Sequence, residues 1–184
     1  MKRHKKQSRV RELTTFAVRP RPGRRDQGII TIGGRAIPCA LGRSGIRALK
    51  REGDGATPVG RWKLKRVLFR SDRGPRPRTR LRVCPIRKSD GWCDAPQDRN
   101  YNRPVHLPYP ASCEALWRDD ILYNIVIILN HNQRPRVRGR GSAIFAHIAR
   151  PDMSATEGCI AMRTHDLQFI LRQCGSRAVF AVLG

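Results

Sequence analysis

The longest apolar block in this 184-residue chain, ILYNIVIIL at residues 121–129, is interrupted by Asn124 and is too short to cross a membrane as a helix. Its isoleucine- and valine-rich composition favours a central strand that is buried on both faces. The other apolar segments are equally short and are divided by glycine and proline. They therefore predict a mainly β fold without a membrane-spanning segment.

Several shorter patterns predict the individual strands. The segment GIITIGGRAIPCAL, at residues 28–41, indicates a hairpin that turns at Gly33 and Gly34. Further strands are expected over residues 61–69, 81–86, 142–149 and 177–184. The segment at 89–110 contains four prolines among polar turn-forming residues. It predicts a long loop, with neither helix nor regular strand, that lines or covers a site.

Only one segment has a clear helical period. In THDLQFILRQCG, at residues 164–175, spacing of three and four places four side chains on one face: Leu167, Ile170, Leu171 and Cys174. Thr164 is the expected N-cap and Gly175 the expected stop. A second helix of one or two turns is expected in SCEALWR, at residues 112–118, with Ser112 as its cap.

The N-terminal residues differ from the rest of the chain. Residues 1–27 hold ten Lys and Arg residues and two acids, together with Pro20, Pro22 and Gly23. They predict a flexible basic tail before one domain over residues 28–184. The charge is that of a signal peptide's first part, but the apolar part is missing. No signal peptide is visible, which leaves a cytoplasmic location, another export route or a mis-assigned start codon.

The composition is strongly basic, since 38 Lys and Arg residues against 14 acids give a formal charge of +24. Such a chain is attracted to polyanions, so nucleic-acid binding is the alternative function from a different class. No common nucleic-acid recognition module is visible, and few aromatic residues lie among the basic runs. Specific nucleic-acid recognition is therefore not expected. The same charge suits an enzyme that works among anionic polymers.

One histidine and one cysteine suggest chemistry. The six cysteines, at 39, 84, 93, 113, 159 and 174, include no Cys-x-x-Cys pair, so no metal site is expected and most are interpreted as small buried hydrophobes. Cys159 follows Gly158, which lets the backbone turn and point N–H groups at a substrate oxygen. His147 ends an apolar strand 12 positions earlier. The pattern favours a Cys–His acyl-transfer pair, against the alternative of a structural histidine and a core thiol.

These residues lie in a longer pattern. GSAIFAHIARPDMSATEGCIAM, at residues 141–162, resembles the active-site signature of the L,D-transpeptidase catalytic domain (YkuD-type) family, in particular a proteobacterial branch with the sequence TEGC. Upstream, KREGDGATPVGRWKL is similar to a turn and strand of the same family. DGWCDAPQDRNYNRPVHLP is similar to a segment of that branch. The resemblance covers residues 28–184.

The resemblance implies a β-sandwich-like catalytic domain acting on peptidoglycan stem peptides in the periplasm or cell wall, with no cofactor. Cys159 would attack the carbonyl before a terminal D-alanine, His147 would be the general acid and base, and Gly158 would help to hold the oxyanion. Transfer to an amine would form 3-3 cross-links or attach a protein to the wall. Transfer to water would make the enzyme an L,D-carboxypeptidase. Anionic wall polymers are a further candidate partner.

Two positions depart from the family pattern. Glu157 stands where the common signature has histidine, and Ala161 stands where many relatives have arginine. A carboxylate next to the thiol would raise its pKa unless it points away or pairs with an arginine. The expected substrate-binding residues are Thr156, Arg163 and Ser142. Of these, Arg163 is a candidate for the missing arginine, as is Arg150.

Overall fold

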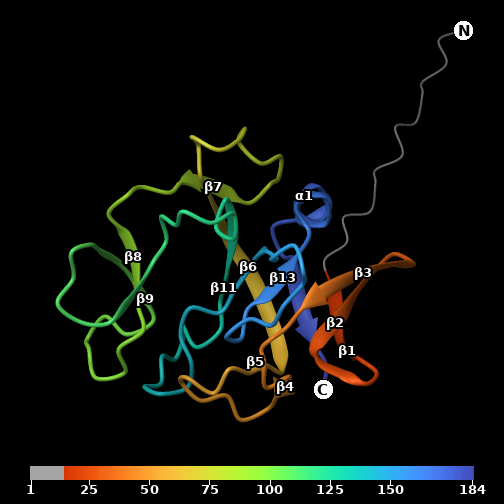
Figure 1. Ribbon diagram of the computed structural model, residues 1–184, viewed down its shortest axis with the longest axis horizontal. Helices are drawn as coiled ribbons and strands as arrows, with labels where there is room; N and C mark the ends of the chain where they lie inside the picture. The colour runs from red at the N-terminus through yellow and green to blue at the C-terminus, as the bar shows by residue number, and fades with distance from the viewer. Residues whose placement is uncertain (1–14) are drawn as a thin grey trace, which may run out of the picture.

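The computed structural model describes residues 15–184. Its main sheet has the strand order β11-β12-β13-β3-β2-β1-β14-β6-β7 (Figure 1). Because β11 also pairs with β6, eight of these strands close into a ring, and β7 extends the sheet beside β6. The bounds are β1 Thr15–Arg21, β2 Arg24–Ile32, β3 Arg35–Ala40, β6 Gly60–Phe69, β7 Arg82–Pro85, β11 Ile125–Leu129, β12 Phe145–Ile148, β13 Ile160–Met162 and β14 Val179–Val182.

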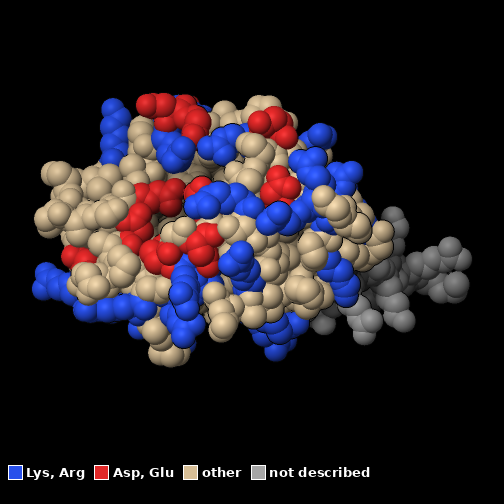
Figure 2. All heavy atoms as spheres, turned by 60° about the horizontal axis from the view of Figure 1, so that its bottom comes forward, with Lys and Arg blue, Asp and Glu red and all other residues tan. Residues whose placement is uncertain are grey.

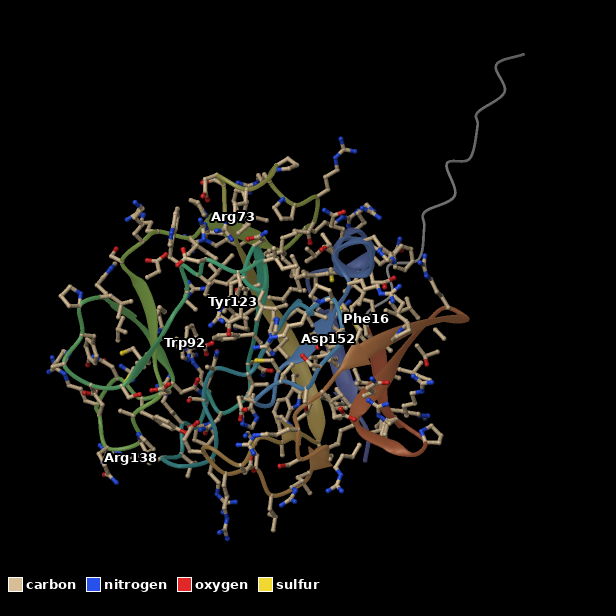
Figure 3. The ribbon with its side chains drawn as sticks, viewed as in Figure 1. Phe16, Arg73, Trp92, Tyr123, Arg138 and Asp152 are labelled. Atoms are coloured by element: carbon tan, nitrogen blue, oxygen red, sulfur yellow. The ribbon has the colours of Figure 1, made fainter. Side chains whose placement is uncertain are left out.

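The ring encloses the main hydrophobic core. Phe16 of β1 and Phe180 of β14 meet there with their ring centroids 5.5 Å apart, and Phe16 is labelled in Figure 3. Alternate residues of a strand face opposite sides, so Ala146 and Ile148 of β12 belong to this core while Phe145 belongs to a second, smaller one. The mainly β fold with one helix after Cys159 is confirmed for the described residues, and its main sheet closes into a ring.

The predicted tail is wrong in its second half. β1 and the start of β2 occupy residues 15–27, with β1 parallel to β14 and antiparallel to β2. Phe16 and Val18 point into the core. Their alternation with outward-facing residues is too short to stand out as a strand pattern among the surrounding charged residues. The domain therefore begins before residue 28. Residues 1–14 lie outside the described residues, and a flexible tail there stays a prediction.

The helix α1 Thr164–Gln173 is confirmed, and it buries Leu167, Ile170 and Leu171 completely. Its N-cap is Arg163, which makes no side-chain capping hydrogen bond, so the assignment of Thr164 as the cap is wrong. Among residues 15–184, no helix is long and apolar enough to span a membrane.

A second, three-stranded sheet packs against the outer face of β11 and β12. It consists of β8 Asp90–Cys93, β9 Arg103–His106 and β10 Cys113–Ala115, in the order β10-β8-β9. Trp92 of β8 meets Phe145 of β12 edge-on at 5.2 Å. The prediction that residues 89–110 contain no regular strand is therefore wrong, as is the helix predicted over 112–118. Pro104 is tolerated because β9 is an edge strand, where a missing N–H costs no ladder hydrogen bond.

The glycine-rich segment between β3 and β6 is mostly loop. It contains only the two-residue strands β4 Ile46–Arg47 and β5 Thr57–Pro58, which pair with each other. Gly42 forms an isolated bridge with Thr156, which joins this loop to the segment before Cys159. The loop therefore reaches the residues that the sequence marks as a site.

Candidate active site

The fold brings the predicted cysteine and histidine to the same side of two neighbouring strands. β12 and β13 run parallel, with His147 opposite Ala161, and Cys159 directly precedes β13. The Phe145 N–H lies 3.4 Å from Cys159 Sγ. His147 is two residues further along β12 and so faces the same way as Phe145. The loop at 149–158 thus folds back and brings Cys159 beside β12.

Both side chains line a cavity of about 490 Å³ between the ring and the three-stranded sheet. Its charged lining consists of Glu52, Asp94, Glu114, Arg118, Arg150 and Glu157. Four acids against two arginines give this cavity an acidic wall in a chain of formal charge +24. Figure 2 shows acidic side chains gathered around a hollow on a surface that is otherwise rich in Lys and Arg.

The Cys159 thiol is buried and protonated in this arrangement. Only 8% of the residue is exposed, and Sγ donates to the Ala143 carbonyl at 3.3 Å while accepting from the Phe145 N–H. Burial, with the nearby Glu114 carboxyl as the next cause, raises the pKa of Cys159 to about 12. The thiol therefore needs a base at the moment it reacts.

The His147 imidazole is neutral and has a fixed tautomer. Its Nδ1 lies 2.8 Å from the Ile148 carbonyl oxygen, which can only accept, so Nδ1 carries the proton and Nε2 is left as the basic nitrogen. Burial lowers the pKa of His147 to about 4. Tyr123 packs edge-on against the ring at 5.3 Å and lies near the centre of Figure 3, and its hydroxyl donates to Glu114.

A closed β ring that holds a cysteine and a histidine beside one cavity agrees with a comparison against protein families. The family model of the L,D-transpeptidase catalytic domain, YkuD, matches residues 25–180. The chain belongs to this family. No curated protein and no solved structure matched the chain. The family's activity is of the cysteine-based L,D-transpeptidase type, it acts on peptidoglycan, and its members generally work in the periplasm or cell wall.

Glu157, the departure from the family's common histidine, pairs with an arginine. Arg43 Nε lies 3.0 Å from both carboxylate oxygens, and the Arg43 guanidinium also donates to the Gly53 carbonyl. The Glu157 side chain is 75% exposed. The charge of Glu157 is the smallest of the causes that raise the pKa of Cys159. The exposed Glu157 carboxylate is therefore balanced by Arg43 and is not directed at the Cys159 thiol.

Thr156 shapes the turn before the nucleophile. Its hydroxyl donates to the Cys159 carbonyl at 2.7 Å and accepts from the Gly158 N–H at 3.1 Å. Gly158 has a φ of +130°, and a Cβ there would lie 2.6 Å from the Ala56 carbonyl oxygen, so this turn requires glycine. Because its N–H is donated to Thr156, Gly158 is not poised as the oxyanion donor that the sequence suggested.

Of the other two predicted binding residues, one lines the cavity and one does not. Ser142 lines the cavity, and its buried hydroxyl has no hydrogen-bond partner among the described residues. Arg163 lies elsewhere, beside a separate hollow next to β2 and β3. It is the N-cap of α1 and follows β13, whereas Cys159 precedes that strand. Its assignment to the substrate is therefore wrong. The arginines that do reach the cavity are Arg118 and Arg150, and only Arg150 was among the sequence candidates.

Asn102 supports the site and was missed as a functional residue. It is 2% exposed, and its Oδ1 accepts from Trp92 Nε1 at 2.9 Å and from the Ala143 N–H at 3.2 Å. Its amide donates to the carbonyls of His131 and Asn132. Asn102 and Ala143 both adopt a positive φ, 54° and 48°, which is unusual for residues other than glycine. An asparagine in a proline-rich segment gives no signal of such a role.

The exposed ion pair leads to a prediction. We expect Glu157→Gln to change the free energy of unfolding by less than about 1 kcal/mol, because exposed ion pairs contribute little. The rate of Cys159 acylation should change by no more than a few-fold, as measured by mass spectrometry with an acylating β-lactam. Arg43→Gln is the matched variant and should behave in the same way. A tenfold or larger rise in rate for Glu157→Gln, or a comparable fall for Arg43→Gln, would mean that the carboxylate does restrain the thiol.

Proposed function

We propose that the protein is a peptidoglycan L,D-transpeptidase that transfers the acyl group of a stem tetrapeptide from D-alanine to an amine. The observation that carries the proposal is that Cys159 and His147 line the same cavity, within the matched family domain. Cys159 is the nucleophile and His147 the general base and acid. The amine comes from a second stem, which gives a 3-3 cross-link, or from a protein attached to the wall.

The resting contacts indicate the first step. The thiol proton, now directed at the Ala143 carbonyl, passes to His147 Nε2 as the sulfur attacks the donor carbonyl. A pre-formed thiolate–imidazolium pair is disfavoured because burial opposes both charges. The imidazolium then protonates the leaving D-alanine, which leaves a thioester on Cys159. The incoming amine gives its proton to the neutral imidazole and takes the acyl group.

The charge of the cavity supports an amine acceptor over water. Asp94 directly follows β8, Glu114 lies on β10, and Glu52 comes from the loop before β5. Carboxylates attract an ammonium group, whereas they give neutral water no comparable attraction. The guanidinium groups of Arg118 and Arg150 supply the opposite charge, suited to the donor's carboxylate. Transpeptidation is therefore favoured over the L,D-carboxypeptidase alternative.

A synthetic stem tetrapeptide tests the function. With an amine acceptor present, we expect D-alanine to be released and a cross-linked product to form, both detected by mass spectrometry. A tripeptide formed at the same rate with and without acceptor would identify a carboxypeptidase instead. Glu114→Gln should reduce the ratio of transfer to hydrolysis. If the folded protein releases no D-alanine under either condition, the proposal is wrong.

The two pKa values predict an unusual pH dependence. Catalysis needs a neutral imidazole, and this form is lost only as the pH falls through about 4, the pKa of His147. The thiol stays protonated until the pH nears about 12. The acylation rate of the free enzyme should therefore be nearly flat between about pH 5 and 9. A rate that falls with a midpoint near the ordinary histidine pKa of about 6.5 would contradict this protonation state.

The positive surface supports anionic wall polymers as partners. A second cavity, away from the active site, is lined by Lys65, Arg66, Arg82 and Arg136 and by no acid. Arg136 Nε is buried without a hydrogen-bond partner among residues 15–184. We expect Arg136→Gln to weaken binding to peptidoglycan sacculi at low salt, measured by co-sedimentation, while β-lactam acylation is unchanged. Equal competition by DNA and by an anionic glycan would show charge attraction without preference.

A further inference from the structure

Two cysteines outside the active-site pair face each other across the small sheet. β8 and β10 are antiparallel, and Cys93 lies directly opposite Cys113. The hydrogen bonds that flank them are Asp94 N–H to Ser112 O at 3.2 Å and Leu116 N–H to Asp90 O at 3.0 Å. Counting along the ladder, Cys93 and Cys113 form a non-hydrogen-bonded pair, the type in which side chains approach most closely.

This position meets the geometric requirement for a disulfide. Cα atoms in a non-hydrogen-bonded pair are about 4.5 Å apart, and disulfides span Cα separations of about 4.4–6.8 Å. The side chains of directly opposite residues share one face of the sheet. The remaining four cysteines, Cys39, Cys84, Cys159 and Cys174, do not lie opposite another cysteine in any strand pair of the described residues.

We propose that Cys93 and Cys113 form a structural disulfide when the protein meets an oxidising disulfide, while Cys159 stays reduced. Cys113 is partly exposed and reacts first, whereas Cys93 is fully buried. The Cys113 thiolate attacks the oxidant's disulfide and releases one thiol. The Cys93 thiolate then attacks the Cys113 sulfur and releases the second thiol. Two electrons and two protons pass to the oxidant, and one S–S bond forms in the protein.

The surroundings favour the oxidised form. Burial, and next repulsion from the Cys93 thiolate, raises the pKa of Cys113 to about 11, and burial also raises the pKa of Cys93. A disulfide is easy to reduce when its reduced thiolate form is stabilised. Here the raised pKa values show no such stabilisation of the reduced pair. The bond would join the two ends of the segment 93–113, which contains Asn102, the hydrogen-bond partner of Trp92. It would also fix Asp94 and Glu114, the residues next to the two cysteines, at the cavity wall.

The test uses the full chain equilibrated with oxidised and reduced glutathione, then denatured, alkylated and mapped by mass spectrometry. We expect a peptide pair joined through Cys93 and Cys113, loss of two hydrogens from the intact mass, and a free Cys159. The oxidised protein should melt about 5–10 °C above the same protein after reduction. Cys84→Ser, the matched control, should keep this difference.

The double variant Cys93→Ser and Cys113→Ser should melt at the same temperature in both glutathione conditions. Comparison of oxidised and reduced wild-type protein gives the answer even if that variant does not fold. Full alkylation of both cysteines after equilibration with oxidised glutathione would overturn the proposal, as would a bond to any other cysteine. The acyl-transfer activity does not enter this test, so its outcome is independent of the proposed function.

Discussion

Replacing His147 with glutamine should slow acylation of Cys159 by about 10²- to 10⁴-fold, the usual contribution of a positioned general base. The loss should be large because the thiol, with a pKa raised to about 12, supplies almost no thiolate of its own at neutral pH. Glutamine keeps much of the buried volume and a donor toward the Ile148 carbonyl. The measurement is the rate of covalent adduct formation with an acylating β-lactam at pH 7.

His131 offers the matched control for this prediction. It is also a buried histidine, with 8% exposed, and its pKa is lowered by burial, but it packs against Trp62 and does not line the active-site cavity. His131→Gln should leave the acylation rate within a few-fold of wild type. If His147→Gln also retains a wild-type rate in a folded protein, another group takes the thiol proton and the proposed base is wrong.

The second large effect is expected at Asn102. Asn102→Ala removes the acceptor for the Trp92 indole and the Ala143 N–H, and it removes the donor to two carbonyls. A buried polar group left without its partner costs about 1–3 kcal/mol. We expect the free energy of unfolding, measured by urea denaturation, to fall by about 2–5 kcal/mol.

Acylation should fall as well, because Asn102 fixes Ala143, whose carbonyl holds the Cys159 thiol. Asn100→Ala is the control, since Asn100 bonds to Tyr109 at a partly buried position away from the cavity. It should cost no more than about 1 kcal/mol. A loss below about 0.5 kcal/mol for Asn102→Ala would show that the network does not hold the site together.

Local patterns predicted the parts of the fold that rest on local chemistry. The hairpin at Gly33 and Gly34, the apolar strand of β11 and the amphipathic helix α1 each have a signal within a dozen residues. The strands β8, β9 and β10 have three or four residues each, among prolines and aspartates. They form because Trp92 and its neighbours pack on the outer face of β11 and β12, a contact between segments distant in sequence. No local pattern reports such packing.

The site shows the same division. Cys159 and His147 were marked by their own spacing and by the family signature, and the fold places both at one cavity. Arg163 was favoured because it is near Cys159 in sequence, but β13 carries it away to the start of α1. Three of the four cavity acids, Glu52, Asp94 and Glu114, come from segments 41 or more residues earlier in the chain than Cys159, as do Arg118 and Asn102. Only the closed ring and the small sheet bring them together.

The central claim is that Cys159 is an acylated nucleophile. The most direct measurement is the intact mass of the full chain after incubation with a carbapenem, followed by peptide mapping, for wild type and for Cys159→Ala. We predict one acyl adduct per wild-type chain, mapped to the peptide that contains Cys159, and no adduct on the variant. A folded wild-type protein that stays unmodified, or an adduct on a different cysteine, would contradict the account.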